Sequence, residues 1–183
     1  MDTRFIFVHG NGGDDWKSAW AEWLKNEIEK LGFATVFETM PDPEKARSEY
    51  WLPHMKDVLK VGKEDVLIGY SSGAVAAMRF GEQHDIRGSI LISPSYTDLG
   101  DELEKESGYF DAPWDWKAIK SHQKKMLVVW GDDDPYIPQH EFAYIVLQLG
   151  ADKMKIPVGG HFQEKQDFME ILKYIKKTYV PKA

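Results

Sequence analysis

Short apolar runs alternate with predicted helices along most of the chain. Six runs have the composition of strands, and they cover 4–10, 34–40, 65–70, 88–94, 124–131 and 153–158. Helical spacing of apolar residues, or at 71–80 a run of small residues, predicts helices at 18–31, 45–60, 71–80, 140–149 and 163–179. Because strands alternate with helices, we predict a three-layer α/β fold with about six mostly parallel strands and helices on both faces.

The run at 65–70 passes without a linker into a predicted helix, and the junction carries the pattern Gly69-x-Ser71-x-Gly73. A strand-to-helix turn of this kind is so sharp that its serine takes a strained conformation, which flanking glycines permit. The turn raises the Ser71 hydroxyl above the sheet and places the backbone N–H of Ser72 at a helix N-terminus. The pattern therefore predicts a nucleophile with half of an oxyanion hole; a serine that only caps the helix is the alternative.

Loops after two later strands carry an acid and a base. Three aspartates, 132–134, follow the fifth predicted strand, and His161 follows the sixth. A serine hydroxyl needs an imidazole to take its proton and a carboxylate to orient that imidazole. The order Ser, Asp, His is typical of α/β-hydrolases, and 63 residues separate Ser71 from Asp134, with 27 more to His161. These intervals leave room for whole strand–helix units, so all three groups are expected at one edge of the sheet.

Four motifs carry a resemblance to a known family: G-N-G-G at 10–13, G-Y-S-S-G-A at 69–74, D-D-P at 133–135 and G-G-H at 159–161. With them the sequence resembles the α/β-hydrolase superfamily, and more closely the small serine hydrolases related to retinoblastoma-binding protein 9. The resemblance covers essentially the whole chain. It implies a compact α/β-hydrolase that lacks the first two strands of the larger enzymes and lacks a large lid. It also places the acid of the triad at Asp134, with Asp133 as the fallback.

The first glycine-rich loop is expected to supply the second oxyanion donor. The backbone N–H of Asn11 is the first choice and that of Gly12 the second. The ring of His9 is expected to hydrogen-bond around this turn and to lie close enough to line the pocket. Most aromatic side chains belong to cores, but several are candidate pocket walls. The full set of candidates is His9, Gly12, Trp51, Tyr70, Tyr96, Trp114, Trp116 and Phe162.

Residues 95–123 interrupt the alternation of strands and helices. They contain an acidic stretch, 98–106, and an aromatic stretch, 109–116, without one clear period. We expect a crossover or short cap with short helices near the mouth of the site, and a plain connector with surface aromatics is the alternative. No linker or repeat divides the sequence, so we expect residues 1–183 to form a single domain.

Composition narrows the chemistry further. The absence of cysteine excludes disulfides, thiolate metal sites and cysteine nucleophiles. The net charge of −7 argues against a nucleic-acid partner. No apolar run approaches the roughly 20 residues that span a bilayer, and the first residues lead into a strand rather than a signal peptide, so we expect no membrane partner and a cytoplasmic protein. One aspartate run with a distant histidine lacks a metal-ligand set, so we expect no metal and no cofactor.

We therefore predict a carboxylesterase-like serine hydrolase that cleaves small ester-type acyl substrates through an acyl-enzyme. The sequence does not tell whether the protein has a protein partner. Two alternatives stay open: a hydrolase-like binding or scaffold protein that keeps the triad without turnover, and an acyltransferase that uses an acceptor other than water. The aromatic content of 95–123 favours a medium apolar or aromatic acyl group.

Overall fold

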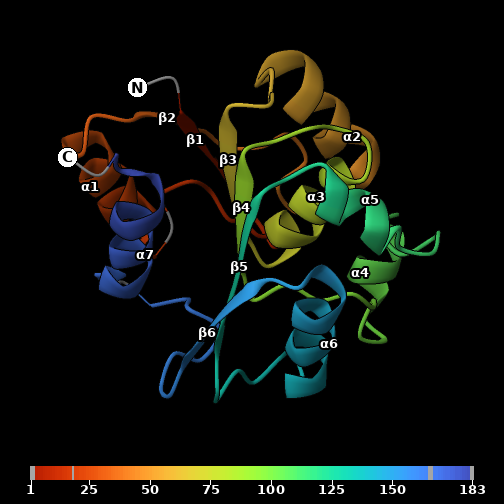
Figure 1. The fold of residues 1–183 in the computed structure, drawn as a ribbon. Helices are drawn as coiled ribbons and strands as arrows, with labels where there is room; N and C mark the ends of the chain where they lie inside the picture. The colour runs from red at the N-terminus through yellow and green to blue at the C-terminus, as the bar shows by residue number, and fades with distance from the viewer. Residues whose placement is uncertain (1–2, 18, 165–166, 182–183) are drawn as a thin grey trace.

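The computed structural model describes residues 3–17, 19–164 and 167–181. Within them, six strands form one sheet in the order β2-β1-β3-β4-β5-β6 (Figure 1). Every neighbouring pair is parallel, which confirms the predicted parallel α/β sheet and makes it parallel throughout. The strands are β1 (Arg4–Val8), β2 (Ala34–Phe37), β3 (Asp65–Tyr70), β4 (Gly88–Ile92), β5 (Lys125–Gly131) and β6 (Asp152–Ile156).

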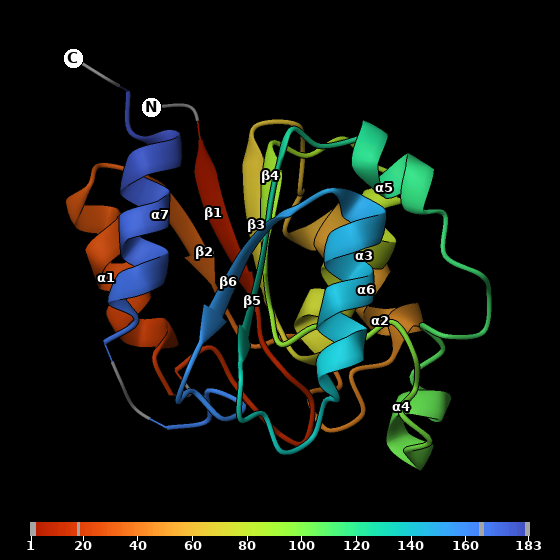
Figure 2. The same cartoon turned by 60° about the horizontal axis from the view of Figure 1, so that its bottom comes forward.

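Helices cover both faces of the sheet, as predicted (Figure 2). One face carries α1 (Ala21–Lys30) and α7 (Met169–Tyr179). The other face carries α2 (Ser48–Pro53), η1 (His54–Val58), α3 (Ser72–Gly81), α5 (Trp116–Ser121) and α6 (Gln139–Leu149), with the short α4 (Glu102–Glu106) at the periphery. No described helix combines the length and apolar character needed to cross a membrane.

The sheet is buried on both sides, and its central strands are mostly apolar. All residues of β3 and β4 are buried. Successive side chains of a strand point to opposite faces. Leu67 thus belongs to the core beneath α3 and α6, whereas Val66 and Ile68 belong to the core beneath α1 and α7. A continuous apolar run is therefore the correct signature of a strand in the middle of this sheet.

The helix predicted at 45–60 differs from the structure in form. The prediction at 45–60 becomes α2 followed by the π-helical turn η1, because Pro53 has no N–H to donate and its ring crowds the preceding turn. The Leu59 amide accordingly donates to the His54 carbonyl, five residues back, at 3.0 Å.

The helix predicted at 163–179 begins only at Met169, and residues 165–166 of that prediction lie outside the described residues. Phe168 stands directly before the helix and packs against Trp20 and Phe162. The helix does not extend to the residues before it. The helix predicted at 18–31 likewise begins later, at Ala21, and Ser18 lies outside the described residues.

Candidate active site

Ser71 occupies the sharp junction between β3 and α3. Its backbone has φ 53° and ψ −121°, a region that residues with a side chain rarely adopt. A Cβ added to Gly69 would lie 2.6 Å from the Ala74 Cα, and one added to Gly73 would overlap the Val8 carbonyl. Only glycine fits at these two positions, so the sequence pattern produces the strained turn that the elbow requires.

A chain of hydrogen bonds runs from Ser71 through His161 to Asp134. The Ser71 hydroxyl lies 3.1 Å from His161 Nε2, and His161 Nδ1 lies 2.8 Å from Asp134 Oδ2. With Nδ1 donating to the carboxylate, Nε2 is left to accept from the hydroxyl. The Asp134 side chain is fully buried and that of His161 is 8% exposed. The structure thus brings together three residues that follow three different strands.

Asp134 is held as an anion by several donors. Its Oδ1 accepts from the backbone N–H groups of Tyr136 and Ile137 at 3.0 and 3.1 Å, and its Oδ2 also accepts from Ser93 Oγ at 3.1 Å. Burial by itself raises the pKa of Asp134, but the hydrogen bonds from His161 and from the two backbone amides outweigh burial. The net effect lowers the pKa, so the carboxylate stays charged opposite the imidazole.

The neighbouring Asp133 has a different place in the structure. Its Oδ1 accepts from the backbone N–H of Gly159 at 2.8 Å and of Gly160 at 2.7 Å, and these bonds lower its pKa. Asp133 therefore fixes the loop that carries His161, whereas Asp134 meets the imidazole itself. This geometry favours Asp134 over Asp133 as the orienting acid.

The backbone N–H groups predicted as oxyanion donors differ in their hydrogen bonds. Within the described part of the chain, no acceptor is found for the backbone N–H of Ser72 or of Asn11. The amide of Gly12, by contrast, donates to the Glu44 carbonyl at 3.0 Å. Of the two amides predicted as the second donor, that of Gly12 is thus already engaged in a backbone hydrogen bond.

A cavity of about 490 Å³ opens beside these groups. Ser71, Ser72, Asn11 and His161 lie along its wall. The remaining wall comes mainly from two segments, the predicted cap at 95–123 and the loop after β5, and includes Leu99, Leu103, Pro135, Tyr136 and Ile137. Part of the segment 95–123, which we predict to be a crossover or short cap, therefore borders this cavity beside Ser71.

Glu104 is a residue of this site that sequence reasoning missed. Its Oε1 accepts from Asn11 Nδ2 at 2.9 Å and from Ser72 Oγ at 3.2 Å. Its Oε2 is buried and has no hydrogen-bond partner among the described residues. Burial raises the pKa of Glu104, against the opposing effect of the hydrogen bond from Ser72. The sequence offered only its position in the acidic stretch 98–106, where nothing distinguishes it from the other carboxylates.

The predicted pocket walls are corrected by the structure. His9, Gly12, Tyr70, Tyr96, Trp114 and Phe162 are not among the residues that line this cavity. The His9 ring is buried instead: Nδ1 lies 2.7 Å from the Gly10 carbonyl, and Nε2 accepts from the Met40 amide at 2.8 Å. Burial lowers the pKa of His9, so a neutral ring holds the turn together.

Tyr70 and Phe162 support the site from behind. Tyr70 belongs to the core beneath α1 and α7, and its hydroxyl donates to the His161 carbonyl at 2.7 Å. Phe162 is 1% exposed and packs in the same core. On the cavity side, the ring facing His161 is Tyr136, with ring centroids 5.2 Å apart. Its position directly after Asp-Asp-Pro was the available signal for this residue.

The aromatic residues of 95–123 pack against the helical layer rather than into the cavity. Trp114 stacks on Trp116 at 5.3 Å, and Tyr96 stacks on Tyr144 of α6 at 4.4 Å. The guanidinium of Arg79 lies 3.7 Å from the centre of the Trp114 ring. Trp51, the remaining candidate, is fully buried with its ring edge against His9. The rings of Tyr96, Trp114 and Trp116 anchor the segment 95–123, and its acidic part borders the cavity.

Comparison with known proteins identifies the family. A family model described as "Serine hydrolase" matches residues 5–177. The chain belongs to this serine hydrolase family. Serine hydrolase RBBP9 of Rattus norvegicus is 38% identical over 181 residues, which cover 98% of this chain and 97% of the rat protein. The predicted resemblance is thereby confirmed.

Solved structures agree on the fold of this serine hydrolase. The ydeN gene product of B. subtilis has a TM-score of 0.86 at 23% identity, covering 97% of this chain and 98% of its own. Est1E from Butyrivibrio proteoclasticus has a TM-score of 0.76 at 15% identity, covering 96% and 86%. At these identities the likeness shows the shared α/β-hydrolase fold.

Proposed function

We propose that this serine hydrolase cleaves small ester-type acyl substrates through a covalent acyl-enzyme on Ser71. The observation that carries the proposal is the continuous hydrogen-bond chain from Asp134 through His161 to Ser71, which ends at the wall of an open cavity. In this scheme Ser71 is the nucleophile, His161 the general base and then acid, and Asp134 the group that orients His161 and stabilises its charged form.

The first half-reaction forms the acyl-enzyme. Ser71 Oγ attacks the substrate carbonyl carbon while its proton passes to His161 Nε2, and the carbonyl electron pair moves onto oxygen. The backbone N–H groups of Ser72 and Asn11 donate to that oxyanion. When the tetrahedral intermediate collapses, the carbon–oxygen bond to the leaving alcohol breaks and His161 returns the proton to the alcohol.

The second half-reaction releases the acid. A water molecule gives a proton to His161 Nε2 and attacks the acyl carbon, again with the oxyanion held by the two backbone amides. Collapse of this intermediate breaks the bond to Ser71 Oγ, which recovers its proton from His161.

The cavity favours an apolar acyl group. Leu99, Leu103, Pro135 and Ile137 contribute apolar surface, and the Tyr136 ring adds a face for an aromatic group. A structure of Est1E holds ferulic acid, an aromatic carboxylic acid of the kind that ester cleavage releases. We extend that chemistry to this chain only as far as a medium apolar or aromatic acyl group.

Labelling with a fluorophosphonate tests the nucleophile. Intact-mass measurement should show one adduct on the wild-type protein and none on Ser71→Ala or His161→Ala. Ser95→Ala is a matched control, because Ser95 is a second serine on the wall of the same cavity and should leave labelling unchanged. A folded wild-type protein that forms no adduct would contradict the proposal and favour a hydrolase-like binding protein.

Substrate class is tested with p-nitrophenyl esters of graded chain length beside a matched amide series. We expect turnover of the esters with an optimum at medium or aromatic acyl groups. Products are then compared with and without added alcohols or amines. Transfer of most acyl groups to those acceptors instead of water would assign the protein to acyltransferases.

A further inference from the structure

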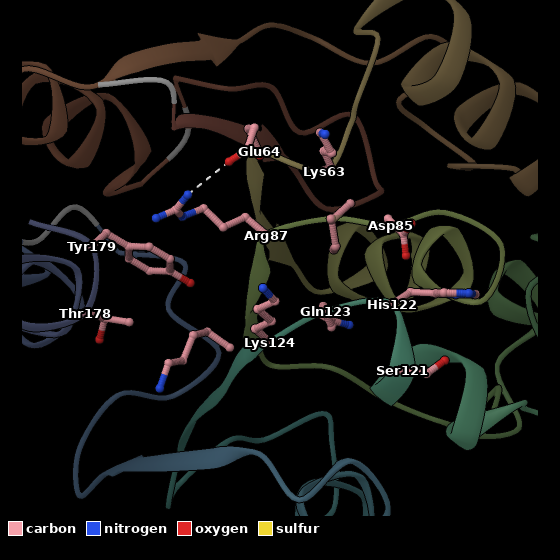
Figure 3. A pocket seen from close by; sticks show the side chains of 12 residues that line it. Lys63, Glu64, Asp85, Arg87, Ser121, His122, Gln123, Lys124, Thr178 and Tyr179 are labelled. Atoms are coloured by element: carbon pink, nitrogen blue, oxygen red, sulfur yellow. Dashed lines mark hydrogen bonds and ion pairs between the residues drawn. The ribbon is translucent and has the colours of Figure 1, made fainter.

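Figure 3 shows a second cavity, which has a volume of about 520 Å³. This cavity lies at the end of the sheet opposite Ser71. Its wall is formed where β3, β4 and β5 begin and where α7 ends. Ser71 follows the carboxyl end of β3, and a strand of six residues is about 20 Å long. The two cavities are therefore separated by the length of the sheet, and the proposed reaction makes no use of the second one.

Tyr179 lines this second cavity and carries a buried hydroxyl that the proposed reaction does not use. The residue is only 6% exposed, and its hydroxyl is buried without a hydrogen-bond partner among the described residues. Its ring packs edge-on against Phe5, with centroids 5.4 Å apart, so the ring is fixed in place. Burial raises the pKa of Tyr179 well above its ordinary value, so the hydroxyl remains a donor at neutral pH. A buried donor without a partner costs free energy, and a ligand that accepts from it would remove that cost.

The backbone leaves room for this hydroxyl. A Cβ added to Gly88, the first residue of β4, would lie 2.7 Å from the Tyr179 hydroxyl oxygen. Figure 3 shows the hydroxyl directed from the end of α7 toward the space between Arg87 and Lys124. The hydroxyl is therefore directed toward the cavity from a buried position at its floor.

Positive charge surrounds the hydroxyl. Lys63, Arg87, Lys124 and Lys125 line the cavity and outnumber its two carboxylates, Glu64 and Asp85. This excess stands out in a protein whose net charge is −7. Arg87 forms an exposed ion pair with Glu64 at 3.0 Å, which leaves part of the guanidinium fork for another partner.

The three lysines of this cavity are open to an anion. Within the described residues, the ammonium groups of Lys63, Lys124 and Lys125 take part in no ion pair. A guanidinium, ammonium groups and a protonated phenol are all donors, and together they match an oxyanion with several acceptor oxygens. The four basic side chains and two carboxylates of the cavity leave a net charge of +2, which a dianion would neutralise. Phosphate carries a charge of about −1.5 to −2 at neutral pH.

We propose that this basic cavity, bounded by Lys63, Arg87, Lys124, Lys125 and Tyr179, binds a phosphate group, either as the free ion or at the end of a small phosphate ester. Tyr179 donates from the buried floor, Arg87 donates from one side, and the lysines supply charge at the rim. The cavity is larger than a phosphate ion, so an organic group attached to the phosphate has space beside it.

Titration followed by ¹⁵N–¹H NMR tests the site without any reference to activity. Inorganic phosphate and phenyl phosphate are the probes, benzoate is the singly charged control, and all are titrated into both the wild-type and Ser71→Ala proteins. We expect saturable shifts of the backbone amides of Arg87 and Lys125 with both phosphates. Tighter binding of phenyl phosphate would assign the site to an ester, and tighter binding of inorganic phosphate to the free ion.

Variants separate the built site from general attraction by surface charge. Tyr179→Phe keeps the ring packing but removes the donor, and Arg87→Gln removes the guanidinium; each should weaken phosphate binding about 10-fold. Tyr174→Phe is the matched control on the same helix, because its hydroxyl lies 3.4 Å from Asp152 outside this cavity. The absence of saturable shifts, equal binding of benzoate, or equal affinity in Tyr179→Phe and wild type would each overturn the proposal. Because the Ser71→Ala protein gives the same readout, failure of the proposed hydrolase activity would leave this test intact.

Discussion

The carboxylate of Glu104 joins the Asn11 side-chain amide, at 2.9 Å, to the Ser72 hydroxyl, at 3.2 Å. Asn11 and Ser72 are the two residues whose backbone N–H groups we propose as oxyanion donors. Glu104 comes from α4, far from both of them in sequence, and it therefore ties the cap segment to both sides of the proposed oxyanion hole. We propose that Glu104 positions these donors, since the carboxylate contacts their side chains and not the reacting atoms.

Removing this link should slow the chemical step. We expect Glu104→Ala to lower kcat for a p-nitrophenyl ester about 10-fold, with a smaller change in KM, because the donors act mainly on the transition state. Glu104→Gln keeps an acceptor oxygen and should recover most of the rate. Glu102→Ala is the control, since Glu102 lies on the same helix and pairs with Lys105 at the surface. Equal kcat values for the Glu104→Ala and Glu102→Ala proteins would refute the positioning role.

The raised pKa of Glu104 also predicts a pH dependence of stability. Burial is its main cause, so the folded protein holds the Glu104 proton to a higher pH than the unfolded chain, whose ordinary pKa is 4.5. Between the two pKa values the folded state binds more protons, and this contribution to stability falls as pH rises.

Glu104→Gln cannot ionise and should therefore escape that loss. We expect its free energy of unfolding, measured by urea denaturation, to rise relative to that of the wild type as the pH increases from 4 to 8. The gap should close at the acidic end, where Glu104 is protonated in both states. A gap that is constant with pH would mean that ionisation of Glu104 does not contribute.

The two neighbouring aspartates should differ in their effect on rate. Asp134→Asn removes the charge opposite His161 and should lower kcat by about 10³- to 10⁴-fold, as loss of the orienting acid does in other triads. Asp133→Asn keeps an acceptor for the amides of Gly159 and Gly160 and should cost less than about 10-fold. Steady-state kinetics on one ester compares them directly. If Asp133→Asn were the more damaging change, the assignment of the acid would move to Asp133.

Gly73 of the elbow should be required for the full stability of the fold. Gly73→Ala would place a Cβ so close to the Val8 carbonyl that the two overlap, and a backbone group cannot move away as a flexible side chain can. We therefore expect destabilisation of about 3 kcal/mol or more. Gly62→Ala is the matched control, because nothing lies within 4 Å of a Cβ there, and it should change stability by about 0.5 kcal/mol or less. Thermal unfolding monitored by circular dichroism measures both. A Gly73→Ala protein as stable as Gly62→Ala would show that the turn can relax.

Long-range packing explains the errors of the sequence-based predictions. Tyr96 and Trp114 were expected at the pocket, and they pack instead on the helical layer with Tyr144 and Arg79. An aromatic side chain suits either place equally well, so composition cannot choose between them. Glu104 was missed for the same reason, since the stretch 98–106 gives no local sign of which carboxylate turns inward.

The sequence by itself determined the order of strands and helices, the strained turn at Ser71 and the chain order of serine, aspartate and histidine. These features follow from local periodicity and from glycines whose missing Cβ atoms allow one backbone path. Only the tertiary structure decided that Asp134 meets His161, that Glu104 bridges Asn11 and Ser72, and that Tyr179 ends among basic side chains. Each of these depends on contacts between segments remote in sequence, and the geometry of such contacts is set by the packing of the whole sheet and its helices.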